Sequence, residues 1–137
     1  MTKLRRIALV VALLPLTPFV SACASNVAAP NVPPTATFVY SPVSPIDAGQ
    51  TQVVFNASGS TDSDGSIASY AWDFGDATAQ HTTQVATITH VFPKTSRCVD
   101  ITYAVLLTVT DNKGGTGSAS NTVTVTNLPA PGSLQCQ

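Results

Sequence analysis

Residues 70–76 read Tyr-Ala-Trp-Asp-Phe-Gly-Asp, and this stretch decides the fold. Its three aromatic residues, Tyr70, Trp72 and Phe74, occupy alternate positions. Because successive side chains of a β-strand point to opposite faces, these three share one face. Burial of such a face is strongly favourable, so we predict a strand whose Trp72 packs in a hydrophobic core. The alternative, an exposed Trp72 that stacks on sugars, does not fit the shared face.

The same period of two recurs on both sides of this stretch. Its longest example is 101–110, where Ile, Tyr, Val, Leu and Val alternate with Thr, Ala, Leu, Thr and Thr. Turn signals follow one another about every 8 to 14 residues, a spacing typical of sandwich folds. We therefore predict an all-β fold, an antiparallel β-sandwich in which each sheet buries one face. The predicted strands contain residues 36–40, 53–57, 70–74, 88–92, 101–110 and 122–126. The predicted core consists of Phe55, Tyr70, Trp72, Phe74, Tyr103, Val105, Leu107 and Val109.

Several segments together resemble a PKD domain, an immunoglobulin-like module of polycystin and of many bacterial surface proteins. The most specific is Trp-Asp-Phe-Gly-Asp at 72–76, and further matches lie at 58–67, 89–92 and 102–112. The resemblance implies an immunoglobulin-like sandwich that serves as a spacer or as a binding module for proteins or polysaccharides. The sequence departs from the family at 93–100, where a longer loop stands in place of a short glycine turn.

Residues 1–22 have the organisation of a secretory signal peptide. Three basic residues within the first six precede a mainly apolar stretch, 7–20, and the small residues Ser21 and Ala22 close it. The apolar run is about 16 residues long, whereas a helix that crosses a bilayer needs roughly 20. It also contains two prolines, so a transmembrane helix is the less favoured alternative.

Val20-Ser21-Ala22-Cys23 resembles the lipobox of bacterial lipoproteins. This resemblance implies that Cys23 is lipidated through its sulfur, becomes the first residue after cleavage, and is acylated at its amine. Several acyl chains anchor a protein stably in a membrane, whereas one does so only marginally. Ordinary secretion with an unpaired Cys23 is the alternative. Ala24 after the cysteine implies outer-membrane sorting if the host is Gram-negative. The expected organisation is a signal peptide at 1–22, Cys23 with a flexible Pro/Ala-rich tether at 23–34, a PKD-like sandwich at 35–127 and a C-terminal tail at 128–137.

Cys98 and Cys136 remain if Cys23 is lipidated, and an exported protein meets an oxidising compartment. The strand that begins near residue 99 turns after Asp111 and returns, so its start lies beside the end of the return strand. Cys98 stands at that start. We therefore predict a disulfide between Cys98 and Cys136, which closes a loop of about 40 residues and contributes roughly 3 to 4 kcal/mol in the chain-entropy model. Two free thiols are the alternative.

Asp62-Ser63-Asp64-Gly65 partly matches an EF-hand calcium loop. The match fails because Ala71 falls at the position that requires a bidentate acid. Resemblance to PKD domains, some of which bind calcium at this loop, leaves Asp62, Asp64 and Asp76 as weak calcium candidates. The favoured interpretation is that these aspartates stabilise turns by accepting hydrogen bonds from nearby amides. No other cofactor is predicted.

Composition and spacing argue against several function classes. After residue 22 three basic residues face seven aspartates, and nucleic acid is therefore an unfavoured partner. Asp73 and Asp76 lack the surroundings of a glycosidase pair, and His81 and His90 lack the neighbours of a metal site. No Ser-His-Asp spacing or phosphate-binding loop is present. We therefore predict a non-catalytic envelope lipoprotein, held at the membrane by its lipid, whose domain binds a protein or a glycan. The alternative is a structural spacer without its own ligand.

Overall fold

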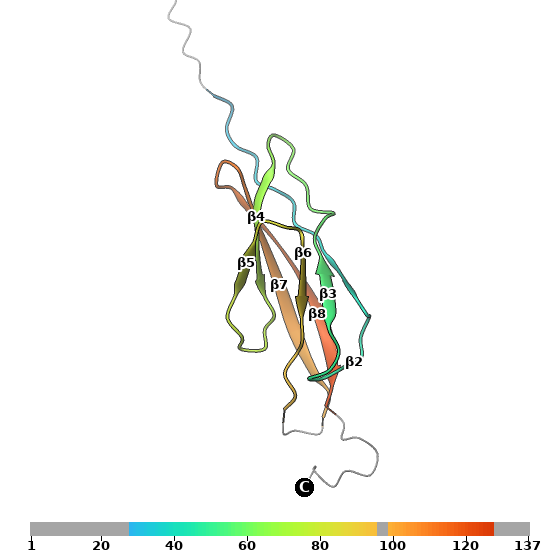
Figure 1. The fold of residues 1–137 in the computed structure, drawn as a ribbon. Coiled ribbons are helices and arrows are strands. Elements are labelled where there is room, and N and C mark those ends of the chain that lie inside the picture. The colour runs from blue at the N-terminus through green and yellow to red at the C-terminus, as the bar shows by residue number, and fades with distance from the viewer. Residues whose placement is uncertain (1–27, 96–98, 128–137) are drawn as a thin grey trace, which may run out of the picture.

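The computed structural model describes residues 28–95 and 99–127, and these form two β-sheets that pack face to face (Figure 1). The three-stranded sheet has the order β1-β3-β6, and the five-stranded sheet has the order β2-β8-β7-β4-β5. The strands are β1 (Val39–Ser41), β2 (Ile46–Asp47), β3 (Val53–Asn56), β4 (Ile67–Asp73), β5 (His81–Thr83), β6 (Thr87–His90), β7 (Ile101–Asp111) and β8 (Thr116–Thr126). Within the described ranges no helix is long and apolar enough to cross a membrane. The predicted all-β immunoglobulin-like sandwich is confirmed.

The hairpin of β7 and β8 is the longest element, as its sequence alternation predicts. Its antiparallel register runs from Ile101 opposite Val125 to Thr110 opposite Thr116. The turn between the strands is closed by Asp111, whose Oδ1 accepts the amides of Lys113 at 2.7 Å and Gly115 at 2.8 Å. Gly114 has φ of +88°, a left-handed conformation that glycine adopts without steric cost. The predicted turn thus follows from an aspartate and a glycine at fixed offsets.

The core lies between the sheets and is centred on Trp72, which is fully buried. The ring of Phe38 meets Trp72 edge-on at a centroid distance of 5.2 Å, and Phe55 lies 5.2 Å from Phe74. Such tilted contacts are worth about 0.5 to 1.5 kcal/mol each beyond area burial. Six of the eight predicted core residues are buried. The other two, Tyr70 and Tyr103, are partly exposed and pack against the edge of the core.

Two short strands were not predicted. β5 pairs with β4 and places His81 opposite Trp72, although none of the predicted strands contains His81. β2 pairs in parallel with the end of β8, through Ile46 opposite Val125. Both strands have too few residues for alternation to be seen, and each is formed because a longer strand offers it a partner.

β2 pairs with only the last two residues of β8, so the rest of the outer edge of β8 has no strand beside it. Side chains and backbone of the segment around β1 cover part of that edge. The hydroxyl of Tyr40 donates to the carbonyl oxygen of Thr122 at 3.0 Å, and the amide of Thr124 donates to Ser44 Oγ at 2.9 Å. Further up this edge the backbone of Pro34 lies against Gly117, where an added Cβ would overlap the Pro34 carbonyl oxygen. The segment around β1 therefore closes an edge that would otherwise present free backbone groups.

Candidate functional site

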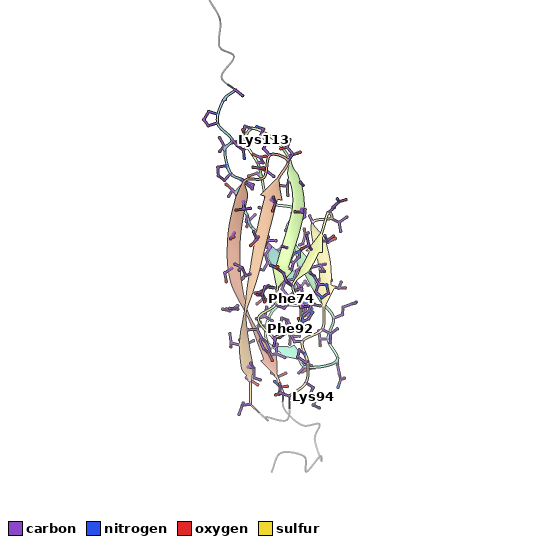
Figure 2. The ribbon with its side chains drawn as sticks, turned by 90° about the vertical axis from the view of Figure 1, so that its left-hand side faces the viewer. Phe74, Phe92, Lys94 and Lys113 are labelled. Atoms are coloured by element: carbon purple, nitrogen blue, oxygen red, sulfur yellow. The ribbon has the colours of Figure 1, made fainter. Side chains whose placement is uncertain are left out.

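The three calcium candidates lie in two separate places. Asp62 and Asp64 belong to the loop before β4, near Lys113 at one end of the sandwich, and Asp76 belongs to the β4–β5 loop beside Phe74 (Figure 2). Among residues 28–95 and 99–127, no three Asp, Glu, His or Cys side chains form a group that could hold a metal ion. The structure therefore brings two of the candidates together and separates the third, and calcium binding stays the less favoured alternative to the role of these aspartates in turns.

Asp64 is paired with a lysine from the β7–β8 turn. Lys113 Nζ lies 2.6 Å from Asp64 Oδ2 and also donates to the Asp64 carbonyl oxygen at 2.8 Å. The hydrogen bond from Lys113 lowers the pKa of the Asp64 carboxyl despite the opposing effect of burial, and the same bond raises the pKa of Lys113. Asp62 Oδ1 accepts the amide of Asp64 at 3.3 Å, which is the turn role that the sequence favours.

Asp111 is a buried acid that sequence reasoning did not single out as a site residue. It is only 2% exposed, and its Oδ2 accepts a hydrogen bond from Asn31 Nδ2 at 2.7 Å. Burial alone would raise the pKa of Asp111, but the bonds from Asn31 and from the amides of Lys113 and Gly115 outweigh it, and the pKa is lowered. Its position, two residues after the inward-facing Val109, was the available signal, because alternation places it on the buried face.

Asp76 is held by a histidine and a threonine. Its Oδ2 lies 2.6 Å from His90 Nε2, and its Oδ1 accepts the Thr78 hydroxyl at 2.6 Å and the Thr78 amide at 3.1 Å. Burial raises the pKa of Asp76, the bonds from Thr78 and His90 lower it, and the lowering prevails. The His90 ring stacks on Phe74 with centroids 3.9 Å apart, so the pair is also fixed by packing. His90 thus links the β4–β5 loop to β6.

The turn that follows Trp72 depends on Gly75. Its φ is +71°, and an added Cβ would lie 2.5 Å from the carbonyl oxygen of Ala104. The amide of Gly75 donates to Asp73 Oδ1 at 2.9 Å. Asp73 and Asp76 therefore each stabilise their own turn, and they do not share a common partner in these contacts. The motif at 72–76 is explained by core packing and turn formation.

The three cysteines, Cys23, Cys98 and Cys136, lie outside the described residues. Lipidation at Cys23 and the disulfide between Cys98 and Cys136 stay predictions. The disulfide prediction assumes that the start of β7 is close to the end of β8, and Ile101 does pair with Val125. The start of β7 therefore lies beside the end of β8.

The outer face of the three-stranded sheet carries exposed valines. Val39, Val54 and Val91 are 67%, 42% and 41% exposed. Val39 stands opposite Asn56 and Ser41 stands opposite Val54, so Val39 and Val54 are diagonal neighbours on one face. Val91 is the residue after β6, and because it follows the inward-facing His90, alternation places it on the same outer side. We call Val39, Val54 and Val91 the valine stripe.

The outer face of the five-stranded sheet is rich in hydroxyl groups instead. Thr102 Oγ1 lies 3.0 Å from Thr124 Oγ1, and Thr108 Oγ1 lies 3.2 Å from Ser118 Oγ. Along the paired strands β7 and β8 the outward positions are Thr or Ser except Ala104 and Leu106, and Leu106 is 39% exposed. We call this surface the hydroxyl face, made of Thr102, Thr108, Thr110, Thr116, Ser118, Ser120, Thr122 and Thr124.

Proteases are prominent among the relatives of this sequence. The chain is 39% identical over 74 residues to the collagenase ColA of Clostridium perfringens and 36% identical over 76 residues to a microbial collagenase of Vibrio alginolyticus. These matches cover 54% and 56% of this chain but only 6% and 8% of the two relatives. The shared part is thus a small module of much longer proteins.

Solved structures identify that module. Carbohydrate-binding modules from the β-sandwich superfamily, known for promiscuous specificity, match with 43% identity and a TM-score of 0.62, over 72% of this chain and 36% of that one. The PKD1 domain of Vibrio anguillarum Epp matches with 30% identity and a TM-score of 0.54, over 73% of this chain and all of that one. The family model for the PKD domain matches residues 31–126. The chain therefore belongs to the PKD domain family.

Proposed function

We propose that this chain is an exported, lipid-anchored and non-catalytic protein whose PKD domain binds a protein or a polysaccharide of the cell envelope. The lipobox-like residues ending at Cys23 support the anchor, and the likeness to carbohydrate-binding modules supports the binding role. The polar groups described above support the absence of catalysis, because Asp64, Asp76 and Asp111 are each engaged in holding a turn or a neighbouring segment.

The valine stripe is the observation that carries the binding role. Val39, Val54 and Val91 give an uncharged surface to the three-stranded sheet, although an exposed valine costs free energy in water. Apolar residues that gather on one face of a small domain commonly mark a contact surface. Among the described aromatic residues, Trp72 and the phenylalanines from Phe38 onward are buried, whereas Tyr40, Tyr70 and Tyr103 are partly exposed at the edge of the core. We therefore assign ligand contact to the outer face of β1, β3 and β6.

A spacer role is the second candidate, and the hydroxyl face favours it. Hydroxyl groups on β7 and β8 pair with one another, as those of Thr102 and Thr124 do, and Leu106 is the one large apolar side chain among them. The described chain also enters the sandwich at one end and leaves β8 at the opposite end (Figure 1). A domain with this geometry holds whatever follows it at a fixed distance from its anchor.

Retention of envelope components on the immobilised full chain tests the binding role. Separate protein and polysaccharide fractions are passed over the wild type and over a Val39→Lys/Val54→Lys variant. The matched control, Thr102→Lys/Ser120→Lys, adds the same charge to the hydroxyl face. Retention by the wild type and the control, but not by the valine variant, is the expected result. If only the hydroxyl-face variant fails to retain the components, the contact lies on the hydroxyl face. If the wild type retains nothing, the spacer role is favoured.

A further inference from the structure

Residues 31–37 form a strap that lies across one end of the sandwich. Its lower part is held by backbone bonds: the Thr35 amide donates to the Thr61 carbonyl oxygen at 2.7 Å, and the Thr61 amide donates back at 3.0 Å. The amide of Thr37 donates to Ser60 Oγ at 3.0 Å. These bonds involve no ionisable groups, so their strength does not change with pH in the acidic and neutral range.

The upper part of the strap, residues 31–34, is held by carboxylates. Asn31 Nδ2 donates to Asp111 Oδ2 at 2.7 Å, and the amide of Val32 donates to Asp64 Oδ1 at 3.2 Å. Val32 itself is largely exposed, so it adds little apolar burial. Asn31 Oδ1 is buried without a hydrogen-bond partner among the described residues, which weakens the docked state. Pro34 is buried at the lower end of this part, and above it the attachment depends on the two bonds to ionised groups.

Two glycines at the start of β8 make room for this docking. A Cβ on Gly115 would lie 2.6 Å from Asn31 Nδ2 and 2.5 Å from Asp111 Oδ2. A Cβ on Gly117 would overlap the carbonyl oxygen of Pro34. Glycine inside a strand weakens the strand by about 0.5 to 1 kcal/mol relative to alanine, so its presence at Gly117 indicates that close approach of the strap is required.

We propose that residues 31–34 are a proton-released latch. When Asp64 and Asp111 are ionised, the latch is docked against Gly115 and Gly117. When these carboxylates are protonated, they no longer hold Asn31 and Val32, and the latch detaches while the backbone pair of Thr35 and Thr61 stays in place. Detachment lengthens the segment that leads to the domain and uncovers the start of β8.

The charged groups around the latch set the direction of the pH response. Asp62, Asp64, Asp111 and Lys113 face it, and residues 31–37 contain no ionisable side chain. The pKa values of Asp64 and Asp111 are lowered in the folded protein, so both carboxylates stabilise docking above their ordinary pKa of about 3.9 and lose this effect as pH falls below it. Deprotonation of Lys113 at strongly alkaline pH removes the partner of Asp64 and leaves the Asn31 bond intact.

Linkage makes the proposal testable at a single carboxyl group. If docking of Asn31 lowers the pKa of Asp111, removal of the Asn31 amide must raise that pKa by an equivalent amount. The experiment records the titration of the Asp111 carboxyl by nuclear magnetic resonance in the isotopically labelled full chain, for the wild type and for Asn31→Ala. In the same samples, hydrogen-exchange protection is measured from pH 6 to pH 3, corrected for the intrinsic pH dependence of exchange.

The expected result is a higher pKa of Asp111 in Asn31→Ala and about tenfold lower protection of the Val32 amide in the wild type at pH 3 than at pH 6. The β7 amides should keep their protection over this range. The control, Gly117→Ala, displaces the latch sterically without altering charge, so its Val32 amide should be weakly protected at every pH. An unchanged pKa of Asp111 in Asn31→Ala, or loss of Val32 and β7 protection together, would overturn the proposal.

Discussion

Each residue of the motif at 72–76 has a distinct physical role. Trp72 fills the core, Asp73 and Gly75 form the turn, and Asp76 binds His90. The sequence predicted the first role because alternation reveals which side chains share a face. It did not predict the bond between Asp76 and His90, because that contact depends on the path of the β4–β5 loop and on the pairing of β6 with β3. Short-range patterns report burial better than they report partners.

Replacement of Trp72 by alanine tests the centre of the core. Trp72→Ala should lower the free energy of unfolding by roughly 3 to 5 kcal/mol, because it removes a large buried side chain and leaves a cavity. Trp72→Phe should cost much less, since the Trp72 indole nitrogen has no hydrogen-bond partner among the described residues and no bond is lost. Urea denaturation followed by circular dichroism measures both. A near-native stability for Trp72→Ala would contradict the central position of this residue.

The lowered pKa of the Asp76 carboxyl makes the stability of the folded domain depend on pH. Its pKa is lowered in the folded protein, so ionised Asp76 stabilises the fold above about pH 4, and this contribution disappears as pH falls through the folded pKa. Asp76→Asn should therefore destabilise the protein by about 1.5 to 3 kcal/mol at pH 7 and by less at pH 3. Asp100→Asn, at an exposed position, is the control and should change stability by under about 0.5 kcal/mol. An equal loss for Asp76→Asn at both pH values would show that the charge is unimportant.

Cys23 carries the prediction of a lipid anchor. The mature protein should begin at Cys23, with its sulfur lipidated and its amine acylated, because residues 20–23 resemble a lipobox. Mass spectrometry of the N-terminal peptide measures this directly, and Cys23→Ser should abolish both the modification and membrane association. A mature N-terminus at another residue, or an unmodified Cys23 amine, would contradict the prediction.

The predicted strands and the observed ones agree where an element is long. β4 and β7 each contain enough alternating residues for their buried face to be read from the sequence. The prediction at 122–126 covers only the last part of β8, because Gly117 and Ala119 are too small to show alternation earlier in the strand. β2 and β5 were missed because two or three residues carry no periodicity. Residues 31–34 of the strap were assigned to the tether because this region is small, polar and rich in proline, with Pro30, Pro33 and Pro34. Its docking depends on Asp111 and Gly117, which lie about 80 residues away in the chain.

A disulfide between Cys98 and Cys136 would join two segments that leave the same end of the hairpin. The premise is the pairing of Ile101 with Val125, which sets the start of β7 beside the end of β8. Intact mass after alkylation of the unfolded, unreduced protein should show neither cysteine modified, and reduction should make both reactive. Cys98→Ser/Cys136→Ser should lower stability by roughly 3 to 4 kcal/mol. Alkylation of both thiols without a reductant would disprove the bridge.

The whole domain combines two chemically different outer faces with ends that point in opposite directions. The valine stripe and the hydroxyl face lie on different sheets, so variants can test them independently. Composition indicated that the surface is weakly charged, but it did not show how the valines and the hydroxyl groups are divided. That division depends on which sheet each strand joins. Alternation in the sequence shows whether a residue faces inward or outward, but it does not show to which sheet the strand belongs.

The covered edge of β8 has a consequence for the proposed lipid-anchored form of the protein. Lipid-anchored molecules diffuse in two dimensions and collide often with their edges side by side. An uncovered strand of eleven residues would offer each neighbour a template for intermolecular strand pairing, which is how aggregates begin. Tyr40 and Ser44 occupy the backbone groups of Thr122 and Thr124, and Pro34 blocks the approach to Gly117. These contacts therefore act as protection against self-association, and in the proposed lipid-anchored form they would keep neighbouring copies as separate molecules.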